Sequence, residues 1–122
     1  MKILLVEDEP LWQQGVKLLL KSQSDLGFEL VGIVDNYDDA LSSFDAEKPD
    51  VVLLDWKLRG SRDGLEIAAA LVEQGVSPGR LVLVSGSEKS MIPPNPYHYV
   101  PKASIAESLV PTLKEIAAQL SS

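Results

Sequence analysis

Short apolar runs that alternate with stretches of helical periodicity constrain the fold of this chain more than any other feature. Four runs are clear, at residues 3–6, 28–34, 51–54 and 81–84, and a weaker fifth candidate lies at 97–100. Nearly continuous runs of Val, Ile and Leu are typical of strands covered by helices on both faces of a sheet. The pattern therefore predicts five buried strands.

Apolar residues recur every three or four positions in the intervening segments. This spacing predicts helices over residues 10–23, 63–74 and 105–120, with a shorter one over 37–44. Pro10 suits the first turn of a helix, and Gly75 suits a helix end. Alternation of strand and helix implies parallel strands joined by right-handed crossovers. We therefore predict an α/β fold with a doubly wound, five-stranded parallel sheet.

The segment between the fourth and fifth strands breaks the alternation. Residues 85–96 contain Pro93, Pro94 and Pro96 and only two apolar side chains, Met91 and Ile92. Proline removes a backbone donor and obstructs a helix interior. We expect a loop with at most one helical turn, so that the helix normally found at this point is shortened or absent.

Composition narrows the class of protein. A chain of 122 residues fits a single domain, here residues 1–122, and the net charge of −7 argues against binding to nucleic-acid phosphates. Cysteine is absent, which excludes disulfides and thiolate metal sites. No apolar run reaches the roughly 18 residues needed to cross a bilayer, and no signal peptide is evident. We expect a cytoplasmic protein that does not enter a membrane.

The residues that follow the predicted strands carry the chemistry, because ligands of open parallel sheets bind beyond the carboxyl ends of the strands. Each residue has an ordinary alternative role: acidic residues such as Glu9 can cap a helix, and Lys102 can be a solvated charge. Together they place three or four carboxylates, a hydroxyl and an amine at one edge. The residues are Glu7, Asp8, Glu9, Asp55, Ser85, Gly86 and Lys102.

Carboxylates brought together repel one another unless a cation joins them. Oxygen ligands without His or Cys select a hard ion, and a site with few protein ligands suits Mg²⁺, which retains several waters. Such an ion would let a carboxylate attack phosphorus. In that arrangement Lys102 would contact phosphoryl oxygens, Ser85 would donate a hydrogen bond, and Gly86 would leave access for the phosphodonor.

These motifs closely resemble the receiver domain of two-component response regulators. The resemblance covers essentially the whole chain and lies in five segments, at residues 4–10 (LLVEDEP), 52–56 (VLLDW), 63–66 (DGLE), 84–86 (VSG) and 99–102 (YVPK). It implies a flavodoxin-like sheet of strand order 2-1-3-4-5. It further implies a phosphoprotein of a phosphorelay rather than a turnover enzyme, with a sensor histidine kinase or a phosphotransfer protein as its partner.

The resemblance also assigns roles to residues. Asp55 is expected to accept the phosphoryl group, with Lys102 paired to it. Mg²⁺ is expected to bind Asp8, Asp55 and the backbone carbonyl of Lys57, with Glu7 acting through water. Ser85 and Tyr99 are expected to form the switch that follows phosphorylation.

Three departures from the family pattern bear on these roles. Arg59 stands four residues after Asp55, where the family often has proline. The segment between Ser85 and Tyr99 is short and contributes to the surface that the family commonly uses for dimers and targets. We therefore expect a loop adapted to a particular partner or to an unusual homodimer. The sequence around Lys102 resembles receivers attached to helix-turn-helix output domains, and this resemblance implies a role in transcription regulation.

Three rival functions were weighed. A phosphatase of the haloacid dehalogenase kind needs a second Asp two residues after the nucleophile, where this chain has Lys57. A nucleotide-binding module needs a glycine-rich turn after the first strand, where the acidic residues 7–9 would repel phosphates. A pseudo-receiver that binds partners without phosphorylation remains the alternative.

Overall fold

The computed structural model describes residues 1–121, in which five parallel strands form one sheet. The strand order is β2-β1-β3-β4-β5, as the resemblance implied. The strands are β1 (Lys2–Val6), β2 (Glu29–Val34), β3 (Val51–Asp55), β4 (Leu81–Ser85) and β5 (His98–Pro101). β1 and β3 lie at the centre of the sheet, and every residue of β3 is buried. The predicted doubly wound fold is confirmed.

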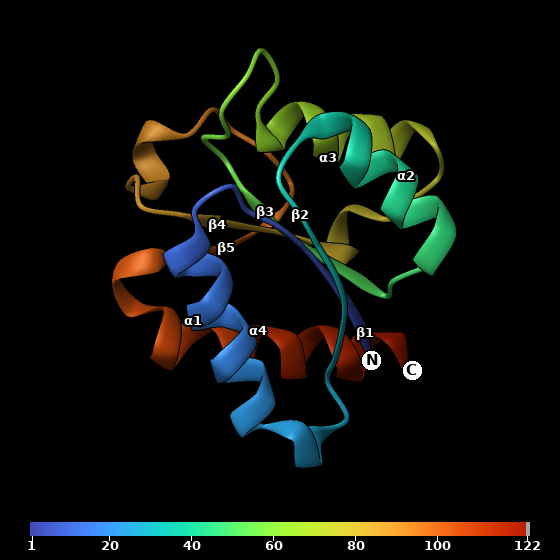
Figure 1. Cartoon of the computed structure of the whole chain (residues 1–122), viewed down its shortest axis with the longest axis vertical. Coiled ribbons are helices and arrows are strands. Elements are labelled where there is room, and N and C mark those ends of the chain that lie inside the picture. Colours follow the sequence, from blue (N-terminus) through green and yellow to red (C-terminus); the bar gives the residue numbers. More distant parts are fainter. Residues whose placement is uncertain (122) are drawn as a thin grey trace.

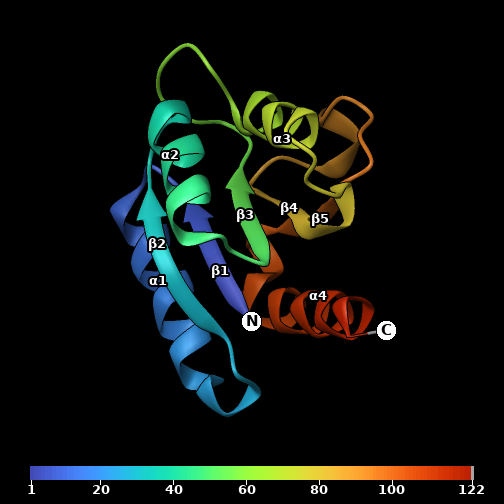
Figure 2. The same ribbon diagram turned by 90° about the vertical axis from the view of Figure 1, so that its right-hand side faces the viewer.

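Two pairs of helices cover the two faces of the sheet (Figures 1 and 2). The helices α1 (Pro10–Ser22) and α4 (Ile105–Leu120) share one face, and α2 (Tyr37–Glu47) and α3 (Gly64–Glu73) share the other. The strands alternate between these layers: Leu5 and Leu53 pack toward α1 and α4, whereas Leu4 and Leu54 pack toward α2 and α3. Side chains therefore enter both cores from each central strand, which explains the continuous apolar runs.

The helices begin where the sequence provides caps. Asp63 caps α3 through the backbone N–H of Glu66, and the Glu66 side chain returns a bond to the backbone N–H of Asp63. Asn36 caps α2 through the N–H of Asp39. Helix α2 runs to Glu47, three residues beyond the predicted end at residue 44. No helix among the described residues is long and apolar enough to cross a membrane.

The expected break between β4 and β5 is confirmed. The connection contains one short 3₁₀ turn, Lys89–Met91, and no α-helix among its residues, all of which the structure describes. Ile92 is buried beside α3 and helps to close that core, together with partly buried Tyr97 and Tyr99. The prolines that follow Ile92 are exposed. A single inserted side chain and two tyrosines thus cover the area of sheet that a helix would otherwise cover.

The start of α3 is held tightly against the end of β3. The N–H of Gly64 donates to the carbonyl of Trp56 at 2.8 Å, and a Cβ at position 64 would overlap the backbone carbonyl of Asp55. Only glycine allows this approach of helix to strand. Because Asp55 ends β3, the position of its side chain depends on this contact.

Gly64→Ala should therefore lower the free energy of unfolding by about 1–3 kcal/mol, the usual range for overpacking. Urea denaturation measures the change. Gly15→Ala is the matched control, because Gly15 lies in α1 with no atom within 4 Å of the added Cβ. It should be stabilising by about 0.5–1 kcal/mol, since alanine favours a helix. Equal effects of the two substitutions would contradict this account of Gly64.

Candidate functional site

The carboxyl ends of the strands bring the predicted site residues to one edge of the sheet. Parallel pairing aligns Asp55 of β3 with Val84 of β4, and Ser85 of β4 with Pro101 of β5. The residues that end or directly follow the strands consequently meet there. They are Glu7, Asp8, Asp55, Ser85 and Lys102.

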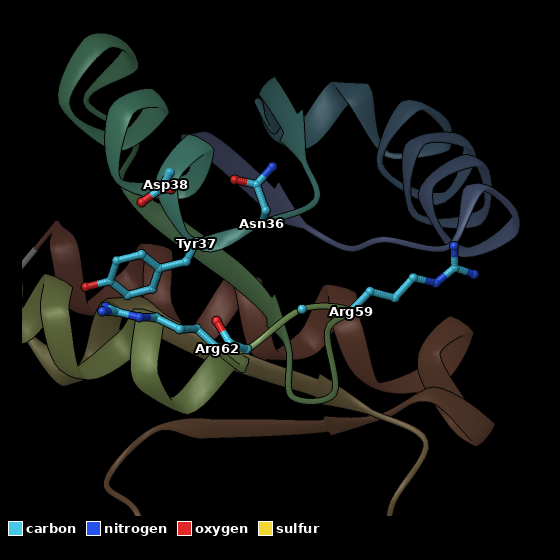
Figure 3. Close-up of a pocket in the computed structure, with 7 residues that line it drawn as sticks. Asn36, Tyr37, Asp38, Arg59 and Arg62 are labelled. Carbon is cyan, nitrogen blue, oxygen red and sulfur yellow. The ribbon is translucent and has the colours of Figure 1, made fainter.

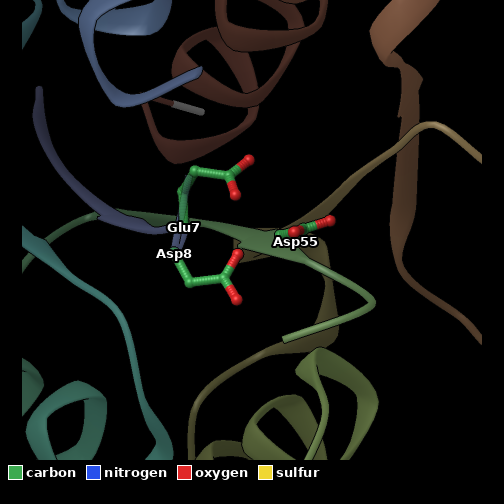
Figure 4. Close-up of side chains that lie close together, drawn as sticks. All are labelled: Glu7, Asp8 and Asp55. Carbon is green, nitrogen blue, oxygen red and sulfur yellow. The ribbon is translucent and has the colours of Figure 1, made fainter. Parts of the chain in front are cut away.

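Three carboxylates converge at this edge, as Figure 4 shows. Glu7, Asp8 and Asp55 each offer one oxygen, and these oxygens all lie within 4.8 Å of one another. Glu7 is 2% exposed and Asp55 is 5% exposed. Buried like charges at this separation call for a cation, and an all-oxygen donor set matches the preference of Mg²⁺. The donor set therefore fits the ion expected from the sequence.

Lys102 lies between two of the carboxylates. Its Nζ is 2.7 Å from Oε1 of Glu7 and 3.4 Å from Oδ1 of Asp55, and its side chain is 9% exposed. Burial alone would lower the pKa of this ammonium, but the hydrogen bond to Glu7 and the attraction of both carboxylates outweigh it, so the pKa lies above its usual value. Lys102 is thus a fixed positive charge beside Asp55.

Asp55 is held in an environment that disfavours its ionised form. Burial, followed by repulsion from Glu7, raises its pKa from 3.8 to about 7, although Lys102 acts in the opposite direction. A second positive charge at the three carboxylates would favour the carboxylate form. The site therefore couples the charge state of Asp55 to cation binding.

A cavity of about 420 Å³ gives access to Asp55. Its lining residues come from the ends of four strands and the start of α1: Glu9, Trp12, Asp55, Lys57, Ser85, Gly86, Ser87, Lys102 and Ala103. A small residue, Gly86, has no atom within 4 Å of an added Cβ, so this side of the cavity is open. The space suits a phosphoryl group that approaches Asp55 from solvent.

The two residues expected to form a switch are joined through one residue of the following loop. The N–H of Ser87 donates to Oγ of Ser85 at 3.0 Å, and Oη of Tyr99 donates to the carbonyl of Ser87 at 2.6 Å. Ser85 is 2% exposed and lines the cavity. A movement of the Ser85 hydroxyl can therefore reach β5 through a single peptide segment.

Lys57, predicted as a carbonyl ligand, lies in the cavity wall, and its ammonium stacks 4.5 Å from the centroid of the Trp56 ring. Trp12 was not among the predicted site residues. It lines the cavity, and its ring centroid lies 5.0 Å from Nζ of Lys102. Its place in the first turn of α1, three residues after the acidic residues 7–9 that follow β1, was the signal that could have identified it.

Comparison with known proteins gives a family match over most of the chain. The model of the response regulator receiver domain matches residues 3–95. This match ends before β5, so it includes Asp55 and Ser85 but neither Tyr99 nor Lys102.

Regulatory proteins from several bacteria resemble the chain. It is 30% identical over 121 residues to the nitrate/nitrite response regulator protein homolog of Haemophilus influenzae, covering 96% of this chain and 57% of that protein. It is 36% identical over 88 residues to the positive alginate biosynthesis regulatory protein of Pseudomonas aeruginosa, covering 72% of this chain and 35% of that protein. The chain thus spans about a third to somewhat over half of these relatives.

A solved structure shows the same fold along the full chain. The signal receiver domain of a modulated diguanylate cyclase from Desulfovibrio desulfuricans superposes with a TM-score of 0.78 at 26% identity, covering 97% of this chain and 94% of that one. The similarity extends through the region beyond residue 95, where the family model no longer matches.

The raised pKa of Asp55 predicts how stability varies with pH. Between pH 3.8 and about 7 the folded chain holds the Asp55 proton more tightly than the unfolded chain, so the free energy of unfolding should fall as pH rises. In chelator-treated protein, Asp55→Asn should be more stable than wild type by about 1–3 kcal/mol at pH 8, with the gap closing toward pH 4. Thermal or urea denaturation across this range measures it.

Asp45→Asn serves as a control, because the Asp45 side chain is 87% exposed on α2. Its stability should follow that of wild type at every pH. A gap between Asp55→Asn and wild type that does not change with pH would contradict the assignment.

Proposed function

Because the chain belongs to the response regulator receiver domain family, we propose that it accepts a phosphoryl group on Asp55 and acts as a switch in two-component signalling. The observation that carries the proposal is the buried Asp55 carboxylate at a cavity, held between two further carboxylates and the Lys102 ammonium. Asp8, Asp55 and the backbone carbonyl of Lys57 would bind Mg²⁺, with Glu7 acting through water, as the resemblance implies. When bound, the ion neutralises negative charge on the transferring group.

The transfer itself uses groups of the chain. An Asp55 carboxylate oxygen forms a bond to phosphorus while the bond from phosphorus to the donor imidazole nitrogen breaks, and the imidazole leaves with the electron pair. The Lys102 ammonium, 3.4 Å from Asp55, compensates charge on the phosphoryl oxygens. The Ser85 hydroxyl can donate to one of these oxygens while it still accepts from Ser87. Hydrolysis of the acyl phosphate returns Asp55 to its carboxylate form, so the chain is a phosphoacceptor rather than a turnover enzyme.

A conformational change at Ser85 would reach Tyr99 through the two hydrogen bonds of Ser87. Drawing Ser85 toward the phosphoryl group shifts Ser87, which accepts the hydrogen bond of Tyr99. Tyr99 lies in β5, at the edge of the sheet and beside the short connection from β4. The surface that changes would therefore include Tyr99 and the loop of residues 86–97.

Incubation with acetyl phosphate and Mg²⁺, followed by intact-mass measurement, tests the acceptor role. Wild type should gain the mass of one phosphoryl group, and Asp55→Asn should gain none, because an amide is not a nucleophile toward phosphorus. Asp63→Asn is the control, since Asp63 caps α3 outside the cavity, and it should be modified like wild type.

An unchanged wild-type mass with acetyl phosphate and with a phosphorylated cognate kinase would favour the pseudo-receiver, an interaction module independent of phosphorylation. An unchanged NMR signal of the Tyr99 ring in phosphorylated protein would contradict the switch role. The first result tests the acceptor role of Asp55, and the second tests the switch role of Tyr99.

We further propose that the phosphodonor, a sensor histidine kinase or a phosphotransfer protein, docks on α1 beside the site. Leu11 is 82% exposed and Leu18 is 64% exposed, and their spacing of seven residues places them on one face of the helix. Gly15 lies between them and presents open backbone. The helix begins at the site edge of the sheet (Figure 1), so a protein bound along this face would reach the cavity.

Leu18→Glu should slow transfer from the phosphorylated partner by about tenfold, since it places a charge in an apolar contact. Modification by acetyl phosphate should be unchanged, because that donor does not need the helix face. Leu120→Glu is the matched control: Leu120 is an exposed leucine, 46% exposed, at the end of α4. Equal losses with both donors would show damage to the site rather than to docking.

A further inference from the structure

The loop from β3 to α3 carries a cation that contacts the candidate metal ligand Asp8. The backbone N–H of Arg59 donates to Oδ2 of Asp8 at 2.8 Å, and Nε of the same arginine lies 3.7 Å from that oxygen. The Asp8 side chain is 8% exposed, whereas that of Arg59 is 83% exposed. An exposed guanidinium therefore faces the open side of a nearly buried carboxylate.

The other cations of this loop are directed elsewhere. The Lys57 ammonium stacks on Trp56, and the Arg62 guanidinium lies 4.2 Å from the centroid of the Tyr37 ring. Arg59 and Arg62 line the same cavity of about 330 Å³, but the Arg59 side chain extends away from Tyr37 and Arg62 (Figure 3). Among the described residues of this loop, Arg59 is thus the cation paired with a carboxylate of the site.

The two contacts of Arg59 differ in their effect on a divalent ion. The backbone N–H is a fixed dipole that orients Asp8 and can keep its bond while the other oxygen binds a metal. The guanidinium carries a full positive charge, which repels a dication at Asp8. Because the Arg59 side chain is largely exposed, solvent and salt screen this repulsion, so the effect is moderate.

We infer that the Arg59 guanidinium lowers the affinity of this site for divalent cations by a moderate factor. A proline at this position would supply neither the N–H nor the charge. The inference rests on the proposed function in one respect, the assignment of Asp8 as a metal ligand. It requires no phosphoryl transfer, so the two can be tested separately.

Calorimetric titration of chelator-treated protein with Mg²⁺, and separately with Mn²⁺, tests the inference. Arg59→Ala should lower the Kd for the cation about two- to fivefold, because it removes one exposed positive charge that repels the cation. Arg59→Glu should lower the Kd further, because it replaces that charge with a negative one. Arg62→Ala is the matched control, and its Kd should stay within about twofold of wild type. The difference between Arg59→Ala and wild type should narrow at high salt, since the Debye length falls from about 10 Å at 0.1 M to about 3 Å at 1 M.

Equal Kd values for wild type and Arg59→Ala, or equal tightening in Arg62→Ala, would overturn the inference. Thermal unfolding of each variant checks that the fold is retained. If Asp55 is phosphorylated but wild type and Arg59→Ala have equal Kd values, only the inference about Arg59 is contradicted. If the Kd values of wild type and Arg59→Ala differ but Asp55 is not phosphorylated, only the acceptor role of Asp55 is contradicted. If neither wild type nor any variant binds Mg²⁺ or Mn²⁺, the acceptor role and the inference about Arg59 are both contradicted.

Discussion

The electrostatic conflict at the carboxyl edge of the sheet is the constraint on which the rest of the structure depends. Glu7, Asp8 and Asp55 are brought within a few ångströms of one another by the strands that carry them, and two of the three are almost completely buried. Such an arrangement is unfavourable unless positive charge enters it. Lys102 supplies one charge from the position directly after β5, and the donor set suits a divalent ion as a second. The repulsion that opposes folding at this edge would therefore be relieved by a bound cation.

Much of the fold follows from the sequence because the signals are local and redundant. The runs that form β1, β3 and β4 are buried on both faces, so they contain little except Val, Ile and Leu, and their order along the chain alternates with amphipathic helices. The location of the site was predictable from the strands as well. Parallel strands end at one edge of the sheet, and Asp55 and Lys102 lie at or directly after those ends. The strand order, in contrast, came from the resemblance, because alternation alone allows several orders of five parallel strands.

Contacts between side chains of distant segments were not predictable in this way. Trp12 has the spacing of an ordinary core residue of α1, and its position over Lys102 depends on how far α1 and the end of β5 are apart. Likewise Arg59 reaches Asp8 from a loop fifty-one positions along the chain, and loop conformation is not encoded by periodicity. Both residues contact charged groups of the site from outside the matching motifs, so a motif-based interpretation did not predict these contacts.

The connection between β4 and β5, all of which the structure describes, contains no α-helix, and this changes which contacts join the site to β5. A crossover between parallel strands usually contains a helix, whose packing would tie the loop to the sheet through many contacts. Here a single 3₁₀ turn and the buried Ile92 hold it, and the hydrogen bonds of Ser87 link Ser85 to Tyr99 directly. Because these two hydrogen bonds share one residue, a displacement of Ser85 has a short route to β5. The described connection therefore lacks the helical surface expected at this point, while the hydrogen bonds of Ser87 still join Ser85 to Tyr99.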